Sequence, residues 1–445
     1  MNTSVTPTKP AERSASVRLK NAWPILAMAF VIAVGCQAIG SLTIDLGVGS
    51  IIIFPMVWAI LIGAVVSVQT IKPLGLNLQK IANAFVGIAV MLLVARLAFS
   101  IGPSLPLLLD AGPALLVQEI GHLLGTVALA LPLAVLLRMG KSTVGATFSL
   151  DREPAFAMVS EKYGPDSDQY RGVLAMYVFG TLFGAVYISL LASLLTSADI
   201  FDPLALAMGA GVGSGSMMAA AAASIVAQFP AQAEQILAMA AVSNLITTVL
   251  GVYVGIYIAL PLADRFYRLL TRKQVDQQQA VDATAVDENR RFREAAAEAA
   301  APVKLPIWLA MSVLSIVGIA TASVAAKSFS WSIVGGYAIM VALILVSMFL
   351  AKVSRKISAI VWATTIGALI SSPWSPVGEL LTALVTSVDF LSLATVVLVS
   401  AGLSLGKDMP LLKRIGWKII PVGLVAITAS FVLSTVFAEF SLGFW

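Results

Sequence analysis

Residues 203–229 read PLALAMGAGVGSGSMMAAAAASIVAQF, and their interpretation decides the fold. The stretch is apolar enough to enter a membrane, but four glycines stand near its centre: Gly209, Gly211, Gly213 and Gly215. Each glycine inside a helix costs up to about 1 kcal/mol relative to alanine. We therefore expect two short helices that meet at a glycine-rich tip. An ordinary crossing helix, with small residues for close packing, is the alternative.

On both sides of this stretch the chain consists largely of long apolar runs. Hydrophobic residues make up 59% of the 445 residues and charged residues 11%, whereas a soluble domain has roughly a quarter of its residues charged. An apolar run of about 18 residues or more indicates a transmembrane helix. The sequence predicts an all-α polytopic protein of the bacterial inner membrane. Its predicted transmembrane helices, about 11 in number, lie at 22–42, 48–69, 81–101, 107–137, 172–197, 236–262, 306–326, 331–351, 357–371, 390–405 and 418–437.

Lysine and arginine gather in the loops that face the cytoplasm. The N-terminal tail, 1–21, is polar and basic, which predicts a disordered cytoplasmic segment. The loops 138–171 and 263–304 are also basic, so both should lie inside. Three apolar stretches separate these two loops, and three crossings would place the second loop outside. We therefore expect 203–229 to be a re-entrant hairpin that enters and leaves on the outer face.

The chain divides into two predicted membrane halves, 22–262 and 305–445. The charged segment 263–304 joins them, and its content of Ala, Gln and Glu predicts a partly helical, solvated cytoplasmic linker. In the second half, SSPWSPVGE at 371–379 should break the helix and is a candidate counterpart of the hairpin. No sequence repeat is visible, so two inverted halves are a hypothesis.

The tip MGAGVGSGSMM, at 208–218, carries the strongest indication of a binding site. Glycine lets the backbone approach a ligand closely. A half-helix that begins near Ser216 would present unpaired amide hydrogens and a positive dipole end, which favour a carboxylate or another anion. Ser214 and Ser216 could also cap that half-helix. The substrate-binding candidates are the tip residues, an asparagine that could reach the hairpin and an arginine that could pair with a substrate charge: Gly211, Gly213, Ser214, Gly215, Ser216, Asn244 and Arg96.

A second group of polar residues lies in the fourth predicted helix. Ionisable side chains inside a span are costly and are functional candidates by default. Glu119 and His122 are three residues apart, so they share a helix face. The candidates for ion coupling are Asp110, Gln118, Glu119 and His122. In the structural alternative, Glu119 and His122 satisfy each other, and Arg96 and Asp110 lie near the outer interface. A break at 111–113 should interrupt the helix, with Asp110 capping the part that follows.

Several classes of protein find no support in the sequence. It contains no phosphate-binding loop, nucleophile elbow or zinc-hydrolase motif, so we expect neither an enzyme nor an ATP-driven pump. One histidine and one cysteine, Cys36, make neither an ordinary zinc site nor an internal disulfide. The net charge of +5 comes from basic loops, so we expect no nucleic-acid partner. The expected partners are the lipid bilayer, an anionic small molecule and a second copy in a homodimer. We expect no cofactor other than a coupling Na⁺.

Three motifs resemble a bacterial membrane family catalogued as domain of unknown function 3100. They are LLLDAGPALLVQEIGHLLGT at 107–126, GATFSLDREPAFAMVSEKYGPDS at 145–167 and PLALAMGAGVGSGSMMAAAAA at 203–223. The resemblance covers nearly the whole chain except the N-terminal tail and the linker, and it implies no assigned activity.

More distantly, the glycine-rich hairpin and the long central linker are similar to the superfamily of cation–proton antiporters and anion transporters. That superfamily includes 2-hydroxycarboxylate and other organic-anion symporters with paired hairpins. This resemblance implies two inverted halves and substrate binding at the hairpin tips. The second half departs from the pattern, because it has SSPWSP at 371–376 in place of a glycine tip.

From these observations we expect a secondary transporter of a small organic anion, coupled to Na⁺ or H⁺, that binds its substrate at the hairpin. One alternative is a cation or proton exchanger without an organic substrate. Another is a non-transporting membrane scaffold that uses the cytoplasmic loops.

Overall fold

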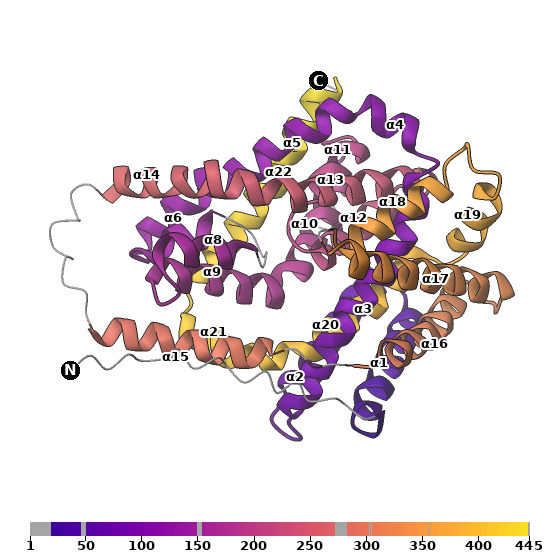
Figure 1. Ribbon diagram of the computed structural model, residues 1–445, viewed down its shortest axis with the longest axis horizontal. Coiled ribbons are helices and arrows are strands. Elements are labelled where there is room, and N and C mark those ends of the chain that lie inside the picture. The colour runs from indigo at the N-terminus through magenta and orange to yellow at the C-terminus, as the bar shows by residue number, and fades with distance from the viewer. Residues whose placement is uncertain are drawn as a thin grey trace.

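In the computed structural model the chain is almost entirely helical (Figure 1). The structure describes residues 19–45, 50–148, 154–271, 283–301, 303, 305–355 and 357–443. Long apolar runs form helices because a helix satisfies its own backbone polar groups where water is absent.

The first half of the chain begins with a helix, a short β-hairpin, a helix of 14 residues and one of 26 residues. Its elements are α1 (Leu19–Ile39), β1 (Leu42–Asp45), β2 (Ser50–Ile53), α2 (Pro55–Val68), α3 (Leu76–Ile101), α4 (Leu105–Asp110), α5 (Gly112–Gly125), η1 (Thr126–Ala130), α6 (Leu131–Leu136), α7 (Ser142–Thr147), α8 (Pro154–Tyr163), α9 (Asp168–Phe179), η2 (Gly180–Gly184), α10 (Ala185–Ser197), α11 (Pro203–Gly209), α12 (Gly215–Val226), η3 (Pro230–Gln232), α13 (Ala233–Val254), η4 (Gly255–Ala259) and α14 (Leu260–Thr271).

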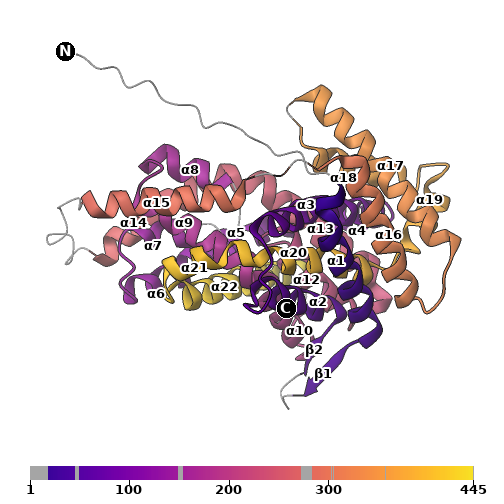
Figure 2. The ribbon, with the colours of Figure 1, turned by 90° about the horizontal axis from the view of Figure 1, so that it is seen from below.

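The remainder starts with the linker helix α15 and ends with α22, which at 24 residues is as long as α17. Its elements are α15 (Ala283–Ala300), α16 (Ile307–Ala325), α17 (Trp331–Ser354), α18 (Ala359–Ile370), α19 (Gly378–Thr386), α20 (Phe390–Ser404), η6 (Leu405–Lys407), α21 (Met409–Ile415) and α22 (Ile419–Leu442). In Figures 1 and 2, α8, α9, α14 and α15 gather at one end of the molecule, and α16, α17 and α19 lie at the other.

Within the described residues, eight helices are long and apolar enough to cross a membrane. They are Ala22–Ile39, Leu76–Ile101, Gly112–Leu136, Asp168–Ser197, Ile307–Ala325, Trp331–Ser354, Phe390–Lys407 and Ile419–Leu442. Three apolar helices are shorter: Pro55–Val68, Gly215–Val226 and Ala359–Ile370. These helices agree with an all-α polytopic membrane protein.

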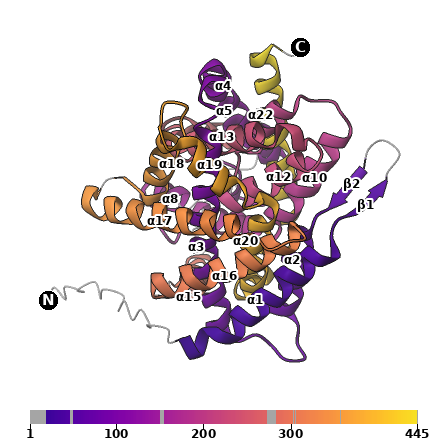
Figure 3. The same cartoon turned by 90° about the vertical axis from the view of Figure 1, so that its right-hand side faces the viewer.

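Three local expectations need correction or completion. The predicted helix 48–69 is a strand, β2, followed by α2, and β2 pairs with β1 in an antiparallel hairpin that projects from the helical body (Figure 3). The predicted cap at Asp110 is wrong, because the N-cap of α5 is Ala111, without a side-chain hydrogen bond. The linker is helical over α14 and α15, whereas 272–282 and the first 18 residues of the N-terminal tail lie outside the described residues.

The glycine-rich stretch is interrupted between α11 and α12. α12 runs alongside α10 in the same direction, since Ser224 hydrogen-bonds Ser189 and Gln228 donates to the Ser193 oxygen at 3.1 Å. α11 runs antiparallel to α22. Before its first turn, the main-chain N–H of Asp202 donates to the Glu439 carboxylate at 3.0 Å, and at its end Gly209 lies beside Thr435. Both ends of the glycine-rich stretch therefore lie near the C-terminal end of α10.

The two halves of the chain interlock. α20, one of the most deeply buried helices, packs between α2 and α3, and α22 packs along α5. Glycines permit the closest approaches: a Cβ atom on Gly402 of α20 would overlap the carbonyl oxygen of Ile60 in α2. A site formed between the halves is therefore lined from both of them.

Candidate functional site

The tip between α11 and α12 has an irregular backbone. Gly213 has a φ of +73°, a left-handed conformation that favours glycine. Ser214 is the N-cap of α12, and its hydroxyl accepts from the main-chain N–H of Met217 at 3.4 Å. The prediction of a serine cap is therefore confirmed at Ser214, and the Ser216 hydroxyl lies 3.0 Å from that of Ser214.

α13 supplies the hydrogen bonds that hold this tip. The Asn244 amide donates to the carbonyl oxygens of Gly211 at 2.8 Å and Gly213 at 3.3 Å. The Ser243 hydroxyl donates to the Met208 oxygen at 2.7 Å. The Met208 oxygen also accepts from the main-chain N–H of Gly211 at 3.0 Å. The side chains of Ser243 and Asn244 therefore add hydrogen bonds to the end of α11 and to the tip, where the helix itself offers few partners.

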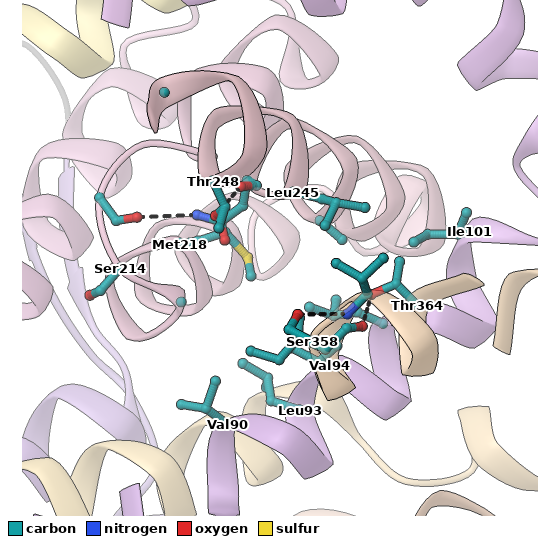
Figure 4. A pocket seen from close by; sticks show the side chains of 18 of the residues that line it. Val90, Leu93, Val94, Ile101, Ser214, Met218, Leu245, Thr248, Ser358 and Thr364 are labelled. Carbon is teal, nitrogen blue, oxygen red and sulfur yellow. Dashed lines mark hydrogen bonds between the residues drawn. The ribbon is translucent and has the colours of Figure 1, made fainter. Parts of the chain in front are cut away.

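A cavity of about 380 Å³ opens beside the tip (Figure 4). The predicted residues Gly213, Ser214, Gly215 and Asn244 line it. Figure 4 shows Ser214 and Thr248 on the side of the hairpin and α13, with Ser358 and Thr364 of α18 across the cavity. The volume is typical of a small-molecule site.

Two helices of opposite halves begin at this cavity. α12 begins after Ser214, and α18 begins after Ser358, whose hydroxyl accepts from the Val361 N–H at 3.4 Å. α18 runs alongside the C-terminal part of α3, where Gly367 packs on Ala98. The first amides of a helix carry a partial positive charge. Both helix starts therefore favour an anion in the cavity.

The rest of the cavity wall is mainly apolar. One side of α3 forms a continuous apolar surface, to which Val90, Leu93, Val94, Leu97 and Ile101 contribute. Among the described residues that line the cavity there is no charged side chain. Such a wall favours the apolar part of an organic molecule over a hydrated inorganic ion.

The predicted ion-coupling residues form a separate buried cluster between α5, α13 and α22. Glu119 is 5% exposed, and its Oε1 accepts from the Gln118 amide at 2.7 Å and from the Thr247 hydroxyl. His122 is also 5% exposed, and its Nδ1 hydrogen-bonds the Ser430 hydroxyl. Asp110 does not belong to this cluster, because it is exposed at the end of α4.

Arg96 has a protein partner. Its guanidinium is 3% exposed and pairs with Glu234, at the start of α13, with an N–O distance of 2.7 Å. Its other nitrogens donate to the Ser100 hydroxyl at 3.0 Å and to the main-chain oxygen of Val388 at 3.1 Å. Arg96 therefore joins α3, α13 and the turn before α20, and it does not line the cavity.

Sequence reasoning missed four polar residues at the two sites. Thr248, Ser358 and Thr364 line the cavity, and Thr247 bonds Glu119. A signal existed for Ser358, because the apolar run that follows it is short for a membrane crossing and serine is a preferred cap. The family-like residues Arg152 and Glu153 lie outside the described residues, and Pro154 begins α8.

The composition, the long apolar helices and the discontinuous helices around a cavity define a multi-pass α-helical membrane protein. The chain belongs to the family described as "Protein of unknown function (DUF3100)", whose model matches residues 34–269, more than half of the chain. The matched region contains the hairpin and α13, and it excludes α18. No curated protein and no solved structure matches the chain.

The pair between Arg96 and Glu234 predicts a specific loss of stability. Glu234→Gln leaves the buried guanidinium without its counter-charge, and because Glu234 is half exposed we expect the free energy of unfolding to fall by about 1–3 kcal/mol. The measurement is denaturant or thermal unfolding of the detergent-purified protein.

The matched control is Glu379→Gln, which changes an exposed glutamate in the first turn of α19 and should have little effect. A double variant, Arg96→Met with Glu234→Leu, should recover part of the loss, since no charge is left buried. Equal stability of Glu234→Gln and the wild type would show that the pair contributes nothing.

Proposed function

We propose that this protein is a secondary active transporter of a small organic anion, with a carboxylate as the expected charged group. The substrate binds in the cavity between the tip of the hairpin and α18, and its transport is coupled to Na⁺ or H⁺. The observation that carries this proposal is the cavity on which two helix N-termini from opposite halves converge.

The charge balance of the cavity supports an anion. The amides at the starts of α12 and α18 provide hydrogen-bond donors and positive partial charge. The described lining residues bring no carboxylate that would repel an anion. Ser214 and Ser358 add hydroxyl groups that can donate to carboxylate oxygens, whereas the Thr248 hydroxyl donates to the main-chain oxygen of Asn244 at 2.7 Å.

The position of the cavity supports transport. It lies between α3, α12 and α13 of the first half and α18 of the second half. Secondary transporters bind their substrates at discontinuous helices between structural repeats, and movement of one part against the other opens the site to each side in turn. A relative movement of α18 and the hairpin would change access to the cavity in this way.

We further propose that the hairpin is re-entrant and that the protein lies in a bacterial inner membrane with a cytoplasmic N-terminus. The distribution of lysine and arginine supports this orientation. The parallel course of α10 and α12 supports the hairpin, because both ends of the glycine-rich stretch lie at the C-terminal end of α10.

The cluster around Glu119 favours a second candidate, a cation or proton exchanger without an organic substrate. It has a buried carboxylate and a histidine on one helix face. This candidate leaves the cavity, with its apolar wall and its two helix N-termini, without a role, so we rank it second. Stabilisation by cations alone would favour it.

Substrate binding predicts a stabilisation that filling the cavity removes. A ligand present at about 100 times its dissociation constant adds about 2.7 kcal/mol of stability, so one or more small carboxylates should raise the melting temperature of the purified protein. Gly251 of α13 lines the cavity, and no atom lies within 4 Å of a Cβ placed on it. Gly251→Leu should therefore fold and abolish the shift, whereas Gly213→Leu would be strained.

Gly87→Leu is the matched control. Gly87 is exposed on α3, has the same open space around its Cβ and does not line the cavity. This variant should retain the carboxylate-dependent shift. A shift that survives in Gly251→Leu would place the binding site elsewhere.

The hairpin predicts that positions 200 and 232 face the same side of the membrane. Ile200→Cys and Gln232→Cys, each in a Cys36→Ala background, should both react with an impermeant maleimide added outside intact cells. Both side chains are exposed, and Cys36 is buried in α1. Glu298→Cys on the linker helix α15 should react only after the cells are opened. Labelling of 200 and 232 from opposite sides would exclude the hairpin.

A further inference from the structure

The hydroxyl of Thr247 lies between two acceptors. One is Oε1 of Glu119, and the other is the main-chain oxygen of Ser243, four residues earlier in α13 and 2.8 Å away. A threonine hydroxyl has one hydrogen, so it can donate to only one of them. Thr247 is 1% exposed and Glu119 is 5% exposed, so both groups are buried. A change in the protonation state of Glu119 can therefore shift the Thr247 hydrogen from one acceptor to the other.

Two arrangements satisfy these groups. When Glu119 is ionised, its Oε1 accepts from the Thr247 hydroxyl and from the Gln118 amide. When Glu119 carries a proton, its own O–H can donate to Oγ1 of Thr247, and Thr247 can then donate to the Ser243 oxygen. Oε1 of Gln118 is a buried oxygen with no hydrogen-bond partner among the described residues, so the cluster can accept one more donor.

The turn of α13 that contains Ser243, the second acceptor of the Thr247 hydroxyl, also holds the hairpin by hydrogen bonds. The hydroxyl of Ser243 donates to the Met208 oxygen, and the next residue, Asn244, donates to Gly211 and Gly213. A threonine that donates to the carbonyl four residues earlier tends to bend its helix. A change in the Thr247 bond therefore acts on the residues that fix the tip beside the cavity.

We propose that Glu119 binds the coupling proton and that Thr247 transmits its presence to the hairpin through Ser243 and Asn244. This inference rests on the proposed function and names the coupling ion as H⁺. In the binding step, a carboxylate oxygen of Glu119 gains an O–H bond to a proton from water on one side of the membrane. In the release step, that proton returns to water on the other side. Thr247 is a positioning residue, because it acts through Ser243 and Asn244.

Other titratable groups lie on the elements packed against Glu119. On α5 itself His122 hydrogen-bonds Ser430, and on α22 Glu439 accepts from the main chain of Asp202. On the remaining neighbours, Glu234 of α13 pairs with Arg96, whereas Asp110 of α4 and Tyr257 of η4 are exposed. Within the described part of the chain, Glu119 is the carboxylate that hydrogen-bonds Thr247.

The test is amide hydrogen exchange of the detergent-purified protein at about pH 5 and about pH 9, a range in which buried carboxylates titrate. Exchange rates are corrected for the intrinsic effect of pH, and the probe is the proton itself, without any carboxylate. In the wild type, protection of the tip at 208–217 and of the turn at 240–247 should differ between the two conditions. No such difference in the wild type would overturn the proposal.

Four variants separate coupling from a structural role. Glu119→Gln removes the titrating group, and Thr247→Val removes the hydroxyl at similar volume, so both should lose the pH-dependent difference. Thr247→Ser keeps the hydroxyl and should restore it. Thr321→Val is the matched control, because Thr321 is fully buried in α16 and donates to the Val317 oxygen at 2.7 Å; it should behave as the wild type. A difference that persists in Thr247→Val or Glu119→Gln would contradict the proposal.

Carboxylate binding is scored separately, by the shift in melting temperature. If carboxylates stabilise the protein while the tip shows no response to pH, the proposed function stands and the proton assignment fails. If the tip responds to pH through Thr247 but no carboxylate binds, the assignment of the proton site stands and the proposal of an organic-anion substrate is refuted.

Discussion

The hydrogen bonds from Ser243 and Asn244 to the hairpin tip are the interaction on which the proposed site depends. Irregular backbone is tolerated at membrane depth only where protein or a water-lined cavity satisfies its polar groups. The carbonyl oxygens of Met208, Gly211 and Gly213 meet this requirement through α13. Because they are satisfied, α12 can begin inside the protein, where Ser214 and Gly215 line the cavity. Without these bonds a continuous helix would be favoured, and the cavity would lose that helix start.

The arrangement has a consequence for movement. Arg96 of α3 bonds Glu234 at the start of α13 and the main-chain oxygen of Val388 in the turn before α20. It therefore links the helix that follows the hairpin to the second half of the chain. Under the proposed function, opening the cavity requires α18 to separate from the hairpin. Ile360 and Val361 of α18 and Val94 and Leu97 of α3 line the cavity with apolar side chains, so the two helices can slide past each other there without exposing a charge.

Local features of the fold and site were predictable from the sequence. The four glycines predicted the interruption of 203–229, and Ser214 and Ser216 were both candidate caps, of which Ser214 is the cap. Asn244 was a candidate for a bond either across helices or to the hairpin, and it bonds the hairpin. The contribution of α18 was not predictable, because it depends on how α18 packs along α3, more than 250 residues away. The same holds for Arg96 and Glu234, which are 138 residues apart. The strand β2 was missed because its isoleucines read equally well as the start of an apolar helix.

Transport of the carboxylate that stabilises the protein tests the central claim most directly. Purified protein is reconstituted into liposomes loaded with that carboxylate, and uptake of the labelled compound is measured by exchange. The account predicts uptake above that of empty liposomes, its loss in Gly251→Leu, and its retention in Gly87→Leu. Binding of the carboxylate without any exchange across the membrane would contradict the account and would indicate a receptor in place of a transporter.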